Sequence, residues 1–415
     1  MKYREQALKR LRDRFWRYMA VGILLVLISL GFGRLSYGVV MPYMRHGLDM
    51  SYAQAGFLGT VTSLGYLVTV LLAGWLSTRW GYKQTVLTGC GVLVGSMVGL
   101  AFTPTYLLAV MFMLGAGVGS GLVFTPALSL MVGWFPERRG LAAGFLMSGT
   151  GLALVLSGLF VPLVGSVSAN GWRWVWVCFA GAALAVLLLA GVVLQNPPRL
   201  ASPGGGGRSL VKEVCQNPRL LRVAVMYFCF GIAYLIPSTF QMSFMLAHRI
   251  PGEVAGLITA MGGLLSLAGT PVWGAVSDGL GRRRTLMIVF GTVTVAMFIP
   301  VLWPTLPGFF LMQLLSGTTM AAIPALLQAA ASEQVPPLYV PVAIGYVTMY
   351  FSVGQLLGPG LGGWLIDHFS GFVAAYLFVV SMLGWGWLLS IGVKTPPPVG
   401  QPVGQAVTGA EDHSR

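Results

Sequence analysis

Long apolar stretches separated by short polar turns fill almost the whole chain. Each stretch reaches the roughly 20 residues that a helix needs to cross a hydrocarbon core about 30 Å thick. Few charges interrupt them, so the pattern predicts an all-α membrane protein with twelve transmembrane helices. The predicted spans are approximately 18–43, 51–77, 84–103, 105–133, 141–167, 172–194, 221–247, 253–277, 285–303, 307–332, 338–367 and 371–393.

The polar turns contain an internal repeat. The sequence GWLSTRWGYK at residues 74–83 returns 200 residues later as GAVSDGLGRR at residues 274–283. A second echo, TPAL at 125–128 and IPAL at 323–326, has nearly the same offset. Two matched phrases at nearly one spacing indicate a duplication. We therefore expect the twelve helices to form two pseudo-symmetric six-helix halves.

Composition and charge agree with a membrane protein and set its orientation. Apolar residues make up 56% of the chain and charged residues only 9%, whereas soluble domains are about one quarter charged. If the N-terminus is cytoplasmic, 21 of the 25 Lys and Arg residues fall on the cytoplasmic side. This bias is the positive-inside rule, and it predicts that both termini are cytoplasmic. The net charge of +14 is thus a topology signal and not evidence of nucleic-acid binding.

The same features divide the chain into five segments. We predict a basic cytoplasmic N-terminus (1–17), an N-terminal six-helix bundle (18–194), a cytoplasmic linker (195–217), a C-terminal six-helix bundle (218–393) and a disordered tail (394–415). The linker and the tail are rich in Pro and Gly. The four cysteines have no C-x-x-C spacing, so we expect neither a metal site nor another cofactor.

The repeated phrase resembles the loop signature of the major facilitator superfamily, which has glycine, aspartate four residues on, then glycine and a basic pair. The second copy carries every position, whereas the first has Thr78 in place of the aspartate. The residues concerned are Gly274, Asp278, Gly281, Arg282 and Arg283 in the second copy, and Gly74, Thr78, Arg79, Gly81 and Lys83 in the first. Two further segments, LGFGRLSY at 30–37 and WFPERRG at 134–140, are similar to the YbfB/YjiJ-type bacterial branch.

The resemblance implies a major facilitator fold that works by alternating access, with a solute site between the halves near the membrane midplane. It also implies that the two loops act as gating latches. Asp278 should then lie near Arg138, Arg139 and the helix N-terminus that follows them, where an anion is favoured. Thr78 brings no charge, so its loop should hold more weakly. The alternative is that these charges only orient the loops.

Arg34 is the most informative single residue. It lies 11 residues before Arg45, about 16 Å along a helix, which places it slightly beyond the middle of the first predicted span. A guanidinium facing lipid there would cost at least about 2.5 kcal/mol, and the sequence has no acidic residue deep in any span to pair with it. We expect Arg34 to face a cavity and bind a carboxylate or similar anion. The alternative is that it bonds backbone carbonyls at a glycine-rich kink or snorkels outward.

Other polar residues fall near the middle of predicted helices and are candidates for the same site. Tyr37 follows Arg34 by three residues and so shares its helix face. The remaining candidates are Tyr66, Thr125, Tyr234, Gln241, Tyr350 and Gln355. Taken singly, each could instead form a hydrogen bond between helices.

The sequence also argues against other classes of function. It contains no G-x-x-x-x-G-K-[ST] motif for ATP and no catalytic signature such as H-E-x-x-H, so an enzyme is not expected. We predict a secondary active transporter or facilitator for a small organic anion such as a carboxylate, of the symporter type, in the inner membrane of a bacterium. It would work as a monomer with a small solute and the lipid bilayer as its partners. The alternative is an efflux pump for amphipathic drug-like compounds.

Overall fold

The structure is a computed structural model that describes residues 2–197, 214, 216–336 and 339–393. Twelve of its helices are long and apolar enough to cross a membrane. The first consists of α1 (Lys2–Val26), the π-helical η1 (Leu27–Leu35) and α2 (Tyr37–Gly47); a 3-10 turn, η2 (Pro136–Arg138), precedes α6. The others are α3 (Tyr52–Trp80), α4 (Tyr82–Phe102), α5 (Tyr106–Trp134), α6 (Arg139–Gly165), α7 (Gly171–Val193), α9 (Pro218–Ala247), α10 (Gly252–Leu280), α11 (Arg282–Leu302), α12 (Leu306–Ser332), α13 (Val340–His368) and α14 (Phe372–Ser390).

The two halves repeat each other closely. In each half the phrase that is repeated in the sequence ends one long helix and begins the next, α3 to α4 and α10 to α11. The break falls at Gly81 in the first copy and at Gly281 in the second, with φ values of 91° and 84°. Only glycine adopts this positive φ at little cost, which explains why both copies keep it. The predicted 195–217 linker falls mostly outside the described residues, and the predicted 394–415 tail falls wholly outside them.

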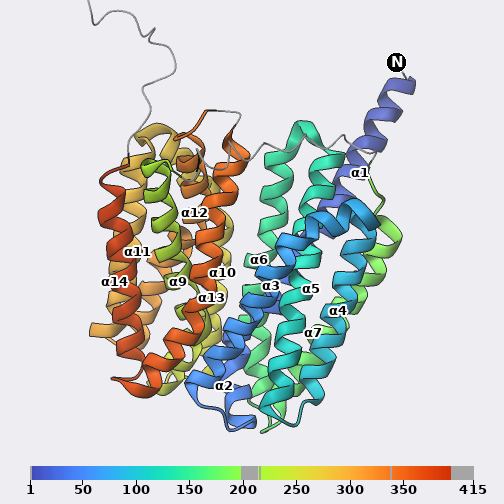
Figure 1. The fold of residues 1–415 in the computed structure, drawn as a ribbon. Coiled ribbons are helices and arrows are strands. Elements are labelled where there is room, and N and C mark those ends of the chain that lie inside the picture. The colour runs from blue at the N-terminus through green and yellow to red at the C-terminus, as the bar shows by residue number, and fades with distance from the viewer. Residues whose placement is uncertain (1, 198–213, 215, 337–338, 394–415) are drawn as a thin grey trace, which may run out of the picture.

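The halves stand side by side and meet chiefly along two pairs of helices, α3 with α13 and α6 with α10, with a smaller contact between α2 and α9 (Figure 1). We call the end of the bundle where α1 begins the basic end. Near the other end, small residues let the paired backbones touch. A Cβ atom on Gly56 of α3 would lie 2.2 Å from the Pro359 carbonyl oxygen of α13, and one on Gly158 of α6 would lie 2.5 Å from that of Gly256 of α10. Both seams are therefore tightly closed at the opposite end.

The same four helices make no such close contact at the basic end, where the ribbons of the two halves diverge (Figure 1). A Cβ atom on any of their described glycines there would have no neighbour within 4 Å. These glycines are Gly74 of α3, Gly140 and Gly144 of α6, Gly274 and Gly279 of α10 and Gly345 of α13. We interpret the structure as the state that is closed at the opposite end and open at the basic end.

The first membrane helix is not a regular α-helix. It takes π-helical winding over Leu27–Leu35, and short segments of this kind occur often at functional sites. Glycines in and after the segment allow close approach of other helices: a Cβ atom on Gly31 would lie 2.2 Å from the Ala153 side chain, and one on Gly38 would lie 1.8 Å from the Ser238 carbonyl oxygen. The altered winding places Arg34 at its C-terminal end, facing the seam between the halves.

Candidate solute-binding site

Arg34 projects from the first helix toward α3 and α13, one from each half. Its Nη2 atom lies 3.4 Å from the Ser63 hydroxyl oxygen and 3.4 Å from the Gln355 side-chain oxygen. The guanidinium carbon lies 4.1 Å from the centre of the Tyr66 ring, which is a cation–π distance. Arg34 thus neither snorkels outward nor bonds the carbonyls of its own kink. It bridges the two halves.

These two contacts satisfy the hydrogen-bond donors of the guanidinium only weakly. A guanidinium has five N–H donors, and good N–H···O hydrogen bonds are about 2.7–3.2 Å long, shorter than either contact of Arg34. Among the residues that the structure describes, both salt bridges belong to Arg282, so no described carboxylate is paired with Arg34. The arrangement is therefore suited to an anionic ligand that would supply the missing acceptors.

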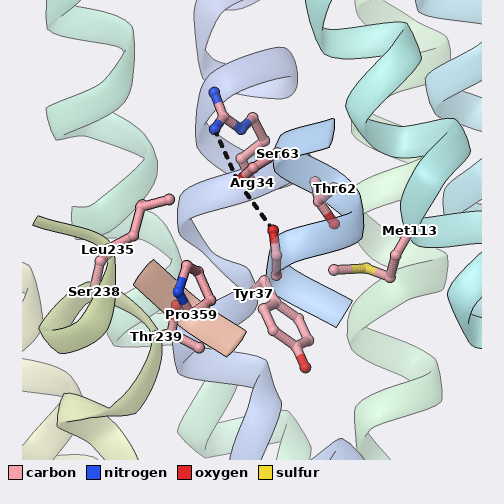
Figure 2. Close-up of a pocket in the computed structure, with 10 residues that line it drawn as sticks. Arg34, Tyr37, Thr62, Ser63, Met113, Leu235, Ser238, Thr239 and Pro359 are labelled. Carbon is pink, nitrogen blue, oxygen red and sulfur yellow. Dashed lines mark hydrogen bonds between the residues drawn. The ribbon is translucent and has the colours of Figure 1, made fainter. Parts of the chain in front are cut away.

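A small chamber of about 20 Å³ lies beside Arg34, and we call it the Arg34 chamber. Figure 2 shows Arg34 and Ser63 at one side of it, with Tyr37, Met113 and Leu235 around the rest. Its walls come from both halves: Arg34, Tyr37, Gly59, Thr62, Ser63, Met113, Leu235, Ser238, Thr239 and Pro359. Apart from Arg34, every one of these side chains is uncharged.

The other predicted residues divide into two groups. Tyr66 and Gln355 contact Arg34. Tyr234 precedes Leu235 and Ser238 of α9, which line the Arg34 chamber. Tyr37 lines the Arg34 chamber, but its hydroxyl donates a 2.8 Å hydrogen bond to the Ala55 carbonyl and so helps to hold α2 against α3.

Three predicted residues have no described contact with Arg34. Gln241 donates a 2.8 Å hydrogen bond to Gln313 of α12, as the interhelical alternative expects. The hydroxyl of Tyr350 lies 3.2 Å from that of Tyr346 on the same helix. Thr125 of α5 is partly exposed and is not among the residues that line the Arg34 chamber.

Several residues near Arg34 were missed by the sequence reasoning, and the nearest of them is Ser63. It lies one turn before Tyr66 on α3, and Ser238 lies one turn after Tyr234 on α9. Residues three or four apart share a helix face, so the two tyrosines gave a signal that could have found both serines. Thr62, Thr239 and Pro359 offered no such signal.

The structure does not hold a metal-binding cluster in its described part. No group of three or more His, Cys, Asp or Glu side chains is placed there to bind an ion. The chemistry available at the site is therefore that of one guanidinium, several hydroxyls, an amide and aromatic rings.

The expected contact between Asp278 and Arg138 is not present. Asp278 is 72% exposed and forms a 2.9 Å salt bridge with Arg282, one turn along the same loop. Arg282 also pairs with Glu333 of α12 at 2.8 Å, while Arg138 lies over the ring of Phe15. The side chain of Arg139 lies outside the described part of the chain. The physical reason is that the halves are apart at the basic end, so each charge takes the nearest partner in its own half.

The first loop shows the same behaviour. The Thr78 hydroxyl donates 2.7 Å to the Trp75 carbonyl, and Arg79 lies over the Trp75 ring. Lys83 donates 2.7 Å from its Nζ atom to the Gly191 carbonyl at the end of α7. No described contact of either loop crosses to the other half.

Comparison with known proteins places the chain in a family. Residues 26–390 match the family described as "Uncharacterised MFS-type transporter YbfB". This match spans nearly all the membrane helices, and the chain belongs to this family of the major facilitator superfamily. The family consists of transporters, in agreement with the fold and with the polar chamber between the halves.

Individual relatives agree with this placement. The chain is 30% identical to monocarboxylate transporter 11 of Homo sapiens over 78% of this chain and 71% of that protein. It is 25% identical to the oxalate:formate antiporter of Oxalobacter formigenes, covering 77% of this chain and 76% of that protein.

Solved structures show the same fold. A bacterial homologue of the lysosomal transporter Spinster, inward-facing and unoccupied, superposes with a TM-score of 0.77 at 16% identity, covering 92% of this chain and 97% of that one. A D-xylose–proton symporter gives a TM-score of 0.75 at 18% identity, covering 92% and 98%.

Proposed function

We propose that this protein moves a small organic anion, of the carboxylate class, across the cytoplasmic membrane by alternating access. The observation that carries the proposal is the position of Arg34 between the halves, in contact with Ser63 of one and Gln355 of the other and without a described carboxylate partner. A solute carboxylate would take up the guanidinium donors that these two long contacts leave weakly used.

The relatives support the same solute class. Monocarboxylate transporters and an oxalate:formate antiporter, by their names, carry small carboxylates, and the chain resembles both along about three quarters of its length. The single deep cation of the described spans suits one carboxylate group at a time.

Orientation follows from charge. The basic end carries the basic N-terminus, Arg79 and Lys83 of the first loop, and Arg282 to Arg284 of the second, so the positive-inside rule makes it the cytoplasmic end. The structure would then be the inward-open state in a bacterial inner membrane. One chain contains the whole Arg34 chamber, which supports a working monomer.

Coupling to protons is also part of the proposal. Among the described residues, none of the groups around Arg34 is a carboxylate or a histidine. Symport of an anion with a proton would therefore use the acid group of the solute itself and would need no protein carboxylate at the site.

Uptake by proteoliposomes tests the proposal. Labelled acetate, lactate and oxalate would be offered with and without an imposed pH gradient, with liposomes lacking protein as the control. Saturable uptake of at least one carboxylate, stimulated by an acidic outside, is the expected result. Uptake of none of them, together with export of ethidium-like cations, would instead favour the efflux alternative.

A further inference from the structure

A second and larger cavity lies at the opposite end of the bundle. Its volume is about 220 Å³, and it is lined by α2, the first residue of α3 and the end of α9. The lining residues are Pro42, Arg45, His46, Tyr52, Ser243, Leu246 and Ala247. We call it the Arg45 cavity.

The Arg45 cavity and the Arg34 chamber lie on the two sides of one constriction. Both are lined by α2 together with α9. Arg45 and Ser243 line the Arg45 cavity, whereas Tyr37 and Ser238 line the Arg34 chamber. Between them the two helices touch, because a Cβ atom on Gly38 would lie 1.8 Å from the Ser238 carbonyl oxygen and Ser243 contacts the sulfur of Met41. The two spaces therefore lie on either side of this contact, and we take them as consecutive parts of one solute route.

The two arginines lie on the same membrane helix, one in each space. Arg34 and Arg45 are 11 residues apart, which is about 16 Å along a helix. A solute anion leaving one guanidinium would next meet the other.

The Arg45 cavity has the chemistry of an anion site. Arg45 is oriented by a 3.2 Å hydrogen bond to the Met50 carbonyl and by the Tyr52 ring, whose centre is 4.3 Å from the guanidinium carbon. Neither Arg45 nor His46 belongs to a salt bridge among the described residues. Of the two acids close to this end of the first helix in sequence or fold, Asp367 accepts hydrogen bonds from the backbone of Tyr52 and Ala53. Asp49, four residues after Arg45, is exposed and forms no salt bridge with Arg45 among the described residues.

We propose that the Arg45 cavity is a second anion-binding site, which holds a carboxylate at the mouth of the route through Arg45 and His46. It is the site from which a solute passes to Arg34, or to which it is released, when the opposite end opens. The inference deepens the proposed function and rests on it for the identity of the solute, whereas the binding site itself can be tested without transport.

Histidine NMR of the full-length protein in nanodiscs provides that test. The chain has four histidines, so ring signals of a histidine-labelled sample are few, and the His46→Gln variant assigns the signal of His46. Sodium acetate and sodium benzoate would be titrated at fixed pH against sodium chloride of equal ionic strength. We expect one of the two carboxylates to shift the His46 signal saturably while chloride does not.

Variants then show which arginine is responsible. Arg45→Gln should weaken the response by about fivefold, as expected for loss of one partly exposed ion pair. Arg45→Lys should retain most of it, which separates loss of charge from loss of folding. Arg249→Gln, an exposed arginine at the same end that does not line the cavity, is the matched control and should have no effect.

The outcomes separate this inference from the proposed function. An unchanged His46 response in Arg34→Gln would support two distinct sites, even if no carboxylate were transported. Absence of a saturable shift with either carboxylate, or equal affinity in Arg45→Gln and the unaltered protein, would overturn the inference while leaving the role of Arg34 intact.

Discussion

The carboxylate of Asp367, near the end of α13, accepts a 2.6 Å hydrogen bond from the backbone N–H of Ala53 at the start of α3. Its other oxygen accepts 3.2 Å from the N–H of Tyr52. A side chain of one half thus caps the N-terminus of a helix of the other half, where free N–H groups and the helix dipole favour an anion. Because the contact joins the two halves at the opposite end, opening of that end would break it.

Asp367→Asn should therefore shift the protein toward the state that is open at the opposite end. The change keeps the shape of the side chain but removes the charge, and a charge at a helix N-terminus is worth up to about 1 kcal/mol, or about fivefold in population. The measurement is labelling of Ser238→Cys, in a protein lacking its native cysteines, by an impermeant reagent from the Asp367 side. Glu253→Gln, another carboxylate at that end, is the control; an equal increase there would argue against a specific cap.

Arg34→Gln should abolish carboxylate uptake while leaving membrane insertion and thermal stability near those of the unaltered protein. The physical reason is that the guanidinium supplies the charge for the solute. Arg34→Lys should restore little, because a point charge replaces a planar fork. Initial uptake rates in proteoliposomes, normalised to folded protein, measure both effects. Full uptake by Arg34→Gln would refute the anion-site interpretation.

Gln355→Glu should block transport by imitating the solute. The amide oxygen already lies 3.4 Å from Arg34, so a carboxylate there would form an internal ion pair in the place of the substrate anion. Gln355→Met removes the acceptor without adding charge and should keep measurable uptake. If the two variants were equally active, Arg34 would not be the residue that the solute must reach.

The two gating loops should be unequal. Closure of the basic end would bring the halves together there. Asp278 could then interact through its charge with the helix N-terminus of the other half, whereas Thr78 has no charge. Asp278→Asn should then favour the state seen here by up to about fivefold, as expected for an exposed charge at a helix end, and Thr78→Ala should change little. Accessibility of a cysteine in the Arg34 chamber from the basic end measures the shift. Equal effects would contradict the asymmetry.

Solute charge should separate transport of anions from drug efflux. Arg34 is the deep fixed charge of the described spans, and a hydrophobic cation would meet its repulsion in a medium of low dielectric. Expression in a drug-hypersensitive host should consequently give no resistance to ethidium-like cations. Resistance that disappears with Arg34→Gln would reverse this expectation.

The sequence was sufficient to predict those features of the site that depend on a single helix. The sequence places Arg34 near the middle of the first span because position along a helix scales with residue number. The face shared by Arg34 and Tyr37, which both line the Arg34 chamber, follows from helical spacing. The neighbours of Arg34 could be proposed only as a pool of polar residues. Of that pool, Tyr66 and Gln355 contact it, whereas Gln241 is occupied by Gln313.

The sequence by itself determined that the chain folds in a lipid bilayer, that it forms twelve membrane helices, that it is a duplication and on which side its positive charges gather. These properties depend on apolar length and on charge summed along the chain, and both are local. Only the tertiary structure decided that Gln355, 321 residues away, meets Arg34, that Asp367 caps α3, and that Asp278 pairs with Arg282 and not with Arg138. Such pairings depend on the rotation of each helix and on which end is open, a balance of a few kcal/mol that local pattern does not encode.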